Sequence, residues 1–159
     1  MHTVPRNLGL LIFVLFALAG LVASASAGDH GPWAIDGNRV AIKGYDTVAY
    51  FTDGKAIQGS ASNEVLRDDV KWWFASAGHR DMFIADPDHY APRFGGFCAG
   101  AMTSGVLVPA NPEQWVIVDG KLYMEAGSIK DWKADAAENI QRANKHWPEV
   151  RARLAAQSQ

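Results

Sequence analysis

The sequence predicts a small single α+β domain with a short antiparallel sheet that includes a hairpin, and with a helix at its C-terminal end. Residues 70–74 alternate with period two, so that apolar side chains share one face of a strand. Asp119-Gly120 separates two short apolar runs, which is a strong hairpin signal. Apolar residues recur at helical spacing over residues 132–147. Strands and helices are interspersed without a regular βαβ period, which favours the α+β class.

Two short strands are expected near the start of the domain, at residues 39–43 and 47–51. Both are brief apolar alternations, and the Gly44-Tyr45-Asp46 segment between them is typical of a turn or bulge. Residues 58–63 are polar and are expected to form a loop. The strand at residues 70–74 follows this loop.

Ser76 is expected to cap the next helix, because its hydroxyl can accept a hydrogen bond from a free backbone N–H of the first turn. This helix should end near Ala85 and bury Met82 and Phe83. Asp86-Pro87 then begins another turn, since proline disfavours helical geometry at the residue before it.

A short helix is expected at residues 97–104, between two glycine signals. Gly95-Gly96 permits a sharp bend before it, and Gly105 stops it. The hairpin strands are expected at residues 115–118 and 121–124, and the last helix is expected to end at Pro148. The aromatic side chains expected in the core are Trp72, Phe74, Phe83, Trp115 and Trp132.

The first 27 residues are expected to be a secretory signal peptide. Arg6 precedes an apolar run of 15 residues, and Ala25-Ser26-Ala27 is a small-x-small cleavage box. The run is shorter than the roughly 20 residues that a membrane-crossing helix needs. We therefore expect an exported domain of residues 28–159, periplasmic or secreted, with no membrane span after cleavage.

Charge and cysteine content narrow the partners that we expect. Beyond residue 27 the chain carries 14 basic and 17 acidic side chains, a balance that attracts neither nucleic acid nor anionic lipid. Cys98 is the single cysteine, so it cannot form a disulfide within its own chain. A metal ion or another exported protein is the expected partner, and the oligomeric state is left open.

Several short motifs follow one another along the chain: Gly44-Tyr45-Asp46-Thr47-Val48-Ala49-Tyr50-Phe51, Trp73-Phe74-Ala75-Ser76, Phe83 with Asp86-Pro87, Tyr90-Ala91-Pro92, Gly95-Gly96-Phe97-Cys98-Ala99 and Trp147-Pro148. These motifs and their order resemble those of the YHS domain family. The resemblance implies a small module of the kind found in exported bacterial proteins, beside some copper-transporting pumps and in metal-linked oxygenases.

The resemblance also implies where metal ligands would lie. In the metal-handling members a pair of cysteines supplies thiolates. Here Ala75 stands at the first of these positions and His79 at the second, so this chain departs from the pattern. The closer similarity is to exported members that lack the pair and carry a glycine-glycine-aromatic-cysteine segment, which ends here in Cys98.

Cys98, His79 and His89 are the predicted metal ligands. Cys98 opens a short helix, where the positive end of the helix dipole favours a thiolate, although a free cysteine can equally be a small buried hydrophobe. His79 falls in the first turn of its helix, and His89 follows Pro87 in a turn; each can instead be an ordinary surface or packing residue. A thiolate suits a soft ion such as copper.

Tyr45 and Asp46 are the predicted ligand-binding residues, because a hydroxyl and a carboxylate stand together in one turn. Aspartate often ties its own turn through a bond from side chain to backbone, and that is the alternative for Asp46.

The leading functional hypothesis is a non-catalytic exported module that binds a soft transition metal, with copper as the candidate ion, through Cys98 with help from His79 or His89. One alternative is an interaction or scaffold domain in which Cys98 is buried and structural. The other is a thiol-dependent enzyme with Cys98 as nucleophile, which the lack of a recognisable catalytic set makes a minority hypothesis.

Overall fold

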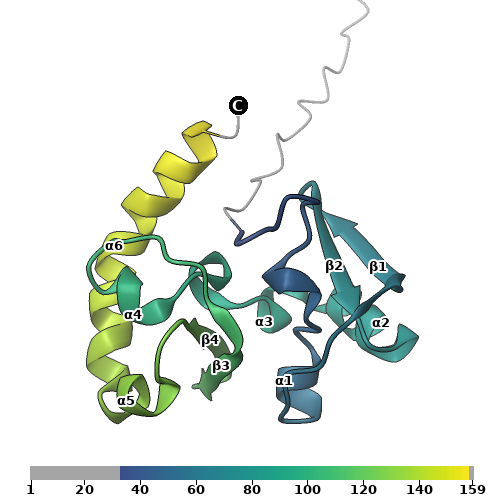
Figure 1. The fold of residues 1–159 in the computed structure, drawn as a ribbon, viewed down its shortest axis with the longest axis horizontal. Helices are drawn as coiled ribbons and strands as arrows, with labels where there is room; N and C mark the ends of the chain where they lie inside the picture. The colour runs from purple at the N-terminus through teal and green to yellow at the C-terminus, as the bar shows by residue number, and fades with distance from the viewer. Residues whose placement is uncertain (1–32, 158–159) are drawn as a thin grey trace, which may run out of the picture.

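Two hairpins, each with its own helices, make up a small single domain of the α+β class, as the sequence predicts (Figure 1). The computed structural model describes residues 33–157, so the expected signal peptide lies outside the described residues. The elements in chain order are α1 Ala49–Thr52, β1 Ser60–Arg67, β2 Val70–Phe74, α2 Ala77–Ala85, α3 Pro87–Tyr90, α4 Ala99–Met102, β3 Asn111–Val118, β4 Lys121–Glu125, α5 Ile129–Ala134 and α6 Ala136–Gln157, with single 3-10 turns at Ile42–Gly44 and Arg93–Gly96.

The hairpin β1–β2 supports the first half of the domain. Its strands pair antiparallel around a turn in which Asp68 and Asp69 adopt φ of 53° and 62°. The predicted alternation of β2 is confirmed, since every second side chain is buried. The prediction of a loop over residues 58–63 is wrong from residue 60 onward, because β1 already begins at Ser60. None of the side chains of β1 is completely buried. Its sequence is therefore mostly polar and lacks the alternation of apolar and polar residues by which a half-buried strand is recognised.

The two strands expected before this hairpin do not form. Residues 39–43 make only isolated bridges at Val40 and Ala41, because φ of 51° at Ile42 and 53° at Lys43 ends the extended backbone. Residues 47–51 instead lead into helix α1. The carboxylate of Asp46 accepts hydrogen bonds from the backbone at the start of this helix, which favours the helical conformation.

Helix α2 forms as predicted, with the Ser76 hydroxyl accepting from the backbone N–H of His79. Phe83 is buried, but Met82 is exposed, so its predicted burial is wrong. The helix expected at residues 97–104 is shorter than predicted, since α4 covers four residues and a turn follows it up to Gly105. The bend before it is present, with φ of 63° and 80° at Gly95 and Gly96.

The hairpin β3–β4 is confirmed, and its turn has φ of 50° at Asp119 and 69° at Gly120. The expected end of the last helix at Pro148 is wrong, because α6 continues to Gln157. Proline removes one helical hydrogen bond, but Val150 lies two residues further along and is buried in the core. Apolar packing beyond the proline therefore sustains the helix.

Two hydrophobic clusters meet at β3–β4. On β4, Leu122 and Met124 belong to the first cluster, and Tyr123 between them belongs to the second. Because successive strand residues point to opposite faces, this hairpin forms a wall between the two clusters. The first cluster also contains residues of β2 and α2, and the second contains residues of α4, α5 and α6.

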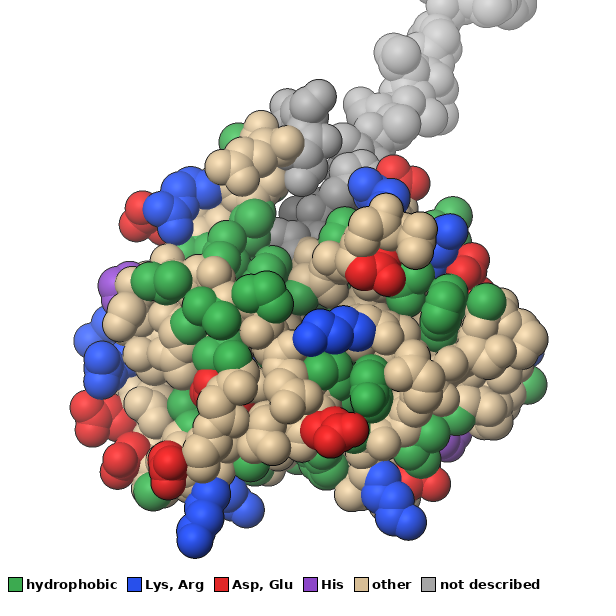
Figure 2. All heavy atoms as spheres, viewed as in Figure 1, with side chains coloured by type: hydrophobic (Ala, Val, Ile, Leu, Met, Phe, Trp, Pro, Cys, Tyr) green, Lys and Arg blue, Asp and Glu red, His purple; other side chains and the backbone are tan. Residues whose placement is uncertain are grey.

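Four of the five predicted core aromatics are buried: Trp72, Phe74, Phe83 and Trp132. Trp115 is half-buried and packs on Tyr50, with ring centroids 4.9 Å apart. On the face drawn in Figure 2, basic and acidic side chains are interspersed. Among the described residues, no helix is long and apolar enough to cross a membrane.

Trp72 is the aromatic on which the first cluster depends, since it contacts Trp33 at 4.9 Å and Phe83 at 5.0 Å between ring centroids. Trp72→Ala should lower the free energy of unfolding by about 3–5 kcal/mol, as measured by urea denaturation. The control is Leu66→Ala in the partner strand, where the side chain is exposed and the change should stay within about 0.5 kcal/mol. Equal losses in the two variants would contradict the burial described above.

Candidate functional site

The carboxylate of Asp46 is fully buried, with 0% of the residue exposed, and protein donors occupy both of its oxygens. Oδ1 accepts from the backbone N–H of Val48 at 2.9 Å and of Ala49 at 3.2 Å. Oδ2 accepts from the backbone N–H of Ala75 at 2.8 Å and faces Nδ1 of His79 at 2.7 Å. This geometry corresponds to the structural alternative for Asp46, in which the side chain ties its own turn.

His79 lies between two carboxylates. Its Nδ1 faces Asp46, while its Nε2 lies 3.5 Å from Oδ2 of Asp53 and 3.4 Å from Oγ1 of Thr52. A carboxylate accepts hydrogen bonds, so the hydrogen of this pair belongs to Nδ1 of His79. The imidazole is thereby held on α2 with its Nε2 directed toward the end of α1.

Cys98 is buried beside a carboxylate. It is 4% exposed, and its thiol donates to Oε1 of Glu125 across 2.6 Å. The backbone N–H of Ala101 donates to Sγ at 3.3 Å. Burial raises the pKa of the Cys98 thiol, and the hydrogen bond to Glu125 raises this pKa further. This direction is opposite to the lowering expected from the start of α4, because one short turn of helix does not offset desolvation.

Glu125 was missed by the sequence reasoning, although it organises the surroundings of Cys98. It is 6% exposed, and its carboxylate also accepts from the backbone N–H of Gly100 and of Ala126, each at 2.9 Å. A Cβ at position 100 would lie 2.6 Å from Oε2 of Glu125, so a larger residue there would displace this carboxylate. The sequence feature that could have identified Glu125 is its position, because this acidic residue directly follows the apolar residues 122–124 of the predicted hairpin strand.

His89 and Tyr45 lie elsewhere. His89 is exposed on α3 and packs against the rings of Phe51 and Tyr90, with centroids 4.8 Å and 4.6 Å away. The hydroxyl of Tyr45 lies 3.5 Å from Oε1 of Glu113 on β3.

The structure does not bring the three predicted metal ligands together. Cys98 lies beside α4 and β4 in one half of the domain, whereas His79 lies on α2 in the other half (Figure 1). Among residues 33–157, no group of three or more His, Cys, Asp and Glu side chains is arranged to hold a metal ion.

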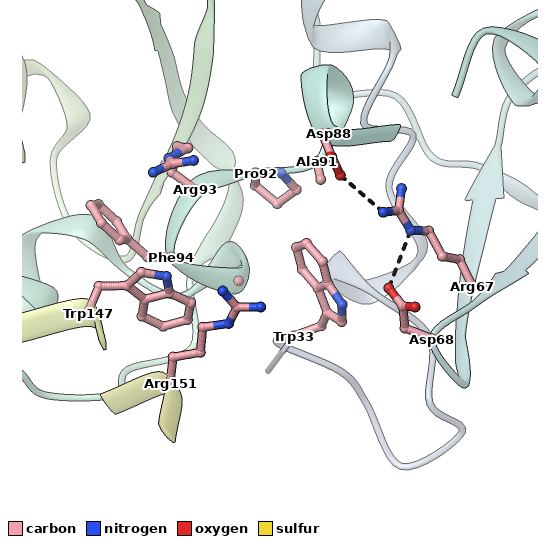
Figure 3. Close-up of a pocket in the computed structure, with 11 residues that line it drawn as sticks. Trp33, Arg67, Asp68, Asp88, Ala91, Pro92, Arg93, Phe94, Trp147 and Arg151 are labelled. Carbon is pink, nitrogen blue, oxygen red and sulfur yellow. Dashed lines mark hydrogen bonds and ion pairs between the residues drawn. The ribbon is translucent and has the colours of Figure 1, made fainter. Parts of the chain in front are cut away.

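A cleft of about 540 Å³ opens between the two halves, and we call it the tryptophan cleft (Figure 3). Trp33 forms one wall, and Phe94 and Trp147 form the other. Its volume falls within the range of about 300–1,000 Å³ that is common for small-molecule sites. The complete lining is Trp33, Arg67, Asp68, Asp88, Ala91, Pro92, Arg93, Phe94, Gly95, Trp147 and Arg151.

Three arginines bring positive charge to the tryptophan cleft. Arg67 is paired with Asp68 at 3.3 Å and with Asp88 at 3.0 Å, so its charge is compensated. Arg93 is exposed and forms no ion pair within the described part of the chain. Arg151 reaches from α6 toward the space between the two indoles (Figure 3). Arg93 is therefore the lining arginine that has no ion pair among residues 33–157.

Comparisons of the chain with models of known protein families, with curated proteins and with solved structures find no match. The similarity to the YHS family thus rests on the short motifs quoted above and stays a hypothesis. Functional proposals for this chain therefore rest on the geometry of the tryptophan cleft and of the buried side chains.

The raised pKa of Cys98 predicts a stability change at alkaline pH. The unfolded chain loses its thiol proton near pH 8.5, before the folded chain does, so this stabilising contribution is complete below that pH and disappears as the pH rises further. Urea denaturation in reducing buffer should show the free energy of unfolding falling from about pH 8 to about pH 9.5. Tyrosines, with an ordinary pKa near 10, begin to titrate at the upper end of this interval, so the thiol is isolated by comparison with a variant that lacks it.

Cys98→Ala is the matched variant for this experiment. It should be less stable than the wild type at pH 7, and its stability should decline less over the same pH interval. Parallel curves for the two proteins would show that the thiol is not protected in the folded state.

Proposed function

We propose that this chain is a non-catalytic exported binding module, similar to the exported YHS domains, and that it binds a small planar organic anion in the tryptophan cleft. The observation that carries the proposal is the presence of two indoles and of the Arg93 guanidinium, which has no ion pair among the described residues, in a cleft of about 540 Å³. Export belongs to the same proposal, and mass spectrometry that finds Met1 retained in the protein outside the cytoplasm would contradict it.

The planar part of the ligand follows from the walls. Trp33 and Trp147 stand on opposite sides of the tryptophan cleft, and Phe94 lies beside Trp147 (Figure 3). Indole rings supply a large and rigid contact area for an aromatic or other flat group. A ring system placed between these side chains would bury apolar surface on both of its faces.

The anionic part follows from the arginines. A guanidinium group pairs with a carboxylate through two parallel hydrogen bonds, which gives this contact both strength and direction. Arg93 is the best placed for this role, because it has no ion pair among the described residues and lies next to Phe94. Arg67 already shares its charge with Asp68 and Asp88.

The lining also favours binding over catalysis. It contains no Ser, Thr, Cys, His, Lys or Tyr side chain, so the described wall offers no hydroxyl, thiol, imidazole or amine nucleophile. Its two carboxylates, Asp68 and Asp88, both face Arg67. Cys98 fits the same proposal as a structural thiol, because Glu125 holds it in the core.

Isothermal titration with 2-naphthoate tests the proposal, and the neutral 2-naphthamide serves as the matched ligand. Naphthoate should bind more tightly than naphthamide, and Arg93→Gln should weaken naphthoate binding by about tenfold, which is about 1.4 kcal/mol. Arg80→Gln is the control, since Arg80 lies on α2 and pairs with Asp81 at 2.8 Å. Equal binding of the two ligands, or no binding, would reject the cleft as an anion site.

Soft-metal binding through Cys98 is the second candidate function. The observation in its favour is the contact of 2.6 Å between the lone thiol and Glu125, which would give a bound ion a second donor. Ligands must lose their protons to bind, so the raised thiol pKa makes copper affinity fall steeply as the pH drops.

A competition titration with Cu(I) and a chromogenic chelator tests this second candidate. Cys98→Ser should abolish tight binding while leaving the fold intact. His79→Ala should change the affinity much less, because His79 lies on α2 in the other half of the domain. If the Cys98→Ser protein binds copper as well as the wild type, or if neither binds it, the buried structural role of Cys98 stands.

A further inference from the structure

We propose that His79 and Asp53 form an open binding site for one divalent transition-metal ion of the zinc type, at the point where α2 meets the end of α1. This site is separate from Cys98 and from the tryptophan cleft. The juxtaposition that supports it is an imidazole whose Nδ1 is engaged by a buried carboxylate and whose Nε2 faces an accessible one.

The orientation of the imidazole is the first step. A metal-binding histidine almost always donates its other ring N–H to a carboxylate or carbonyl, which fixes the tautomer and makes the ligand nitrogen more basic. Asp46 supplies this partner at 2.7 Å from Nδ1. Because Asp46 is 0% exposed and accepts three backbone hydrogen bonds, its position is fixed by the fold.

The spacing of the donors is the second step. Nε2 of His79 lies 3.5 Å from Oδ2 of Asp53 and 3.4 Å from Oγ1 of Thr52. Two ligands on one tetrahedral zinc ion, with bonds of about 2.0–2.2 Å, are separated by about 3.4 Å. The donors are therefore already at the distance that a shared ion requires, without a large movement of either helix.

Orientation and access of the carboxylate complete the site. The Thr52 hydroxyl donates to Oδ2 of Asp53 at 2.6 Å and orients that carboxylate. The His79 side chain is 19% exposed and that of Asp53 is 41% exposed, so an ion can reach both from solvent. Since no third acidic, cysteine or histidine ligand is arranged there within residues 33–157, water would fill the remaining positions of the ion.

Titration of the full chain with zinc chloride at pH 7.5, followed by calorimetry, tests the proposal, and Co²⁺ with its visible absorption spectrum gives a second readout. One ion should bind, and His79→Gln and Asp53→Asn should each weaken binding at least tenfold.

The controls separate this site from the other histidines. His30→Gln, His89→Gln, His146→Gln and Asp81→Asn should each leave the Zn²⁺ affinity unchanged, and circular dichroism should show the native fold in every variant. The proposal is overturned if the wild type binds no Zn²⁺ at millimolar concentration. It is also overturned if the His79→Gln protein binds Zn²⁺ as tightly as the wild type does.

Discussion

The buried carboxylate of Asp46 is the interaction on which the first half of the domain depends. It joins the start of α1, the residue after β2 and the histidine of α2, which are segments far apart in the sequence. Removing it would leave buried backbone N–H groups without acceptors, at a cost of about 1–3 kcal/mol for each group. The Asp46 carboxylate orients His79 and holds the start of α1, the helix that Asp53 directly follows. The proposed ion site therefore depends on the same hydrogen bonds that stabilise this half of the domain.

Glu125 has the same role in the second half. Its carboxylate accepts backbone hydrogen bonds at the beginning of α4 and at the end of β4, and it accepts the thiol hydrogen of Cys98. A buried charge is tolerated only where such donors surround it. Both halves therefore place an acidic side chain inside the domain to satisfy the backbone of a very short helix. The buried carboxylate of Glu125 thus explains why the Cys98 thiol is protonated and enclosed. A structural role is enough to account for a buried thiol at this position.

The parts of the fold that the sequence predicted correctly are those with local signals. The alternation of residues 70–74, the Asp119-Gly120 turn and the Ser76 cap each act within a few residues. β1 could not be predicted because it is a polar strand, and α1 could not because its conformation depends on Asp46 accepting from the backbone. The site was harder to predict, since the partners are distant: Cys98 and Glu125 lie 27 positions apart and Asp46 and His79 lie 33 apart. Spacing in the chain identified Cys98, His79 and Asp46 as special, but it did not reveal their partners.

The hairpin β3–β4 has a consequence for how the molecule opens. Its two faces belong to different hydrophobic clusters, with Met124 on one side and Tyr123 on the other. Neither half can separate from this wall without exposing apolar surface that the other half helps to cover. The backbone amides of β4 should therefore exchange with deuterium only through complete unfolding, whereas those of β1, whose side chains are exposed or half-buried, should exchange through smaller local openings. The domain should behave as one cooperative unit despite its two cores.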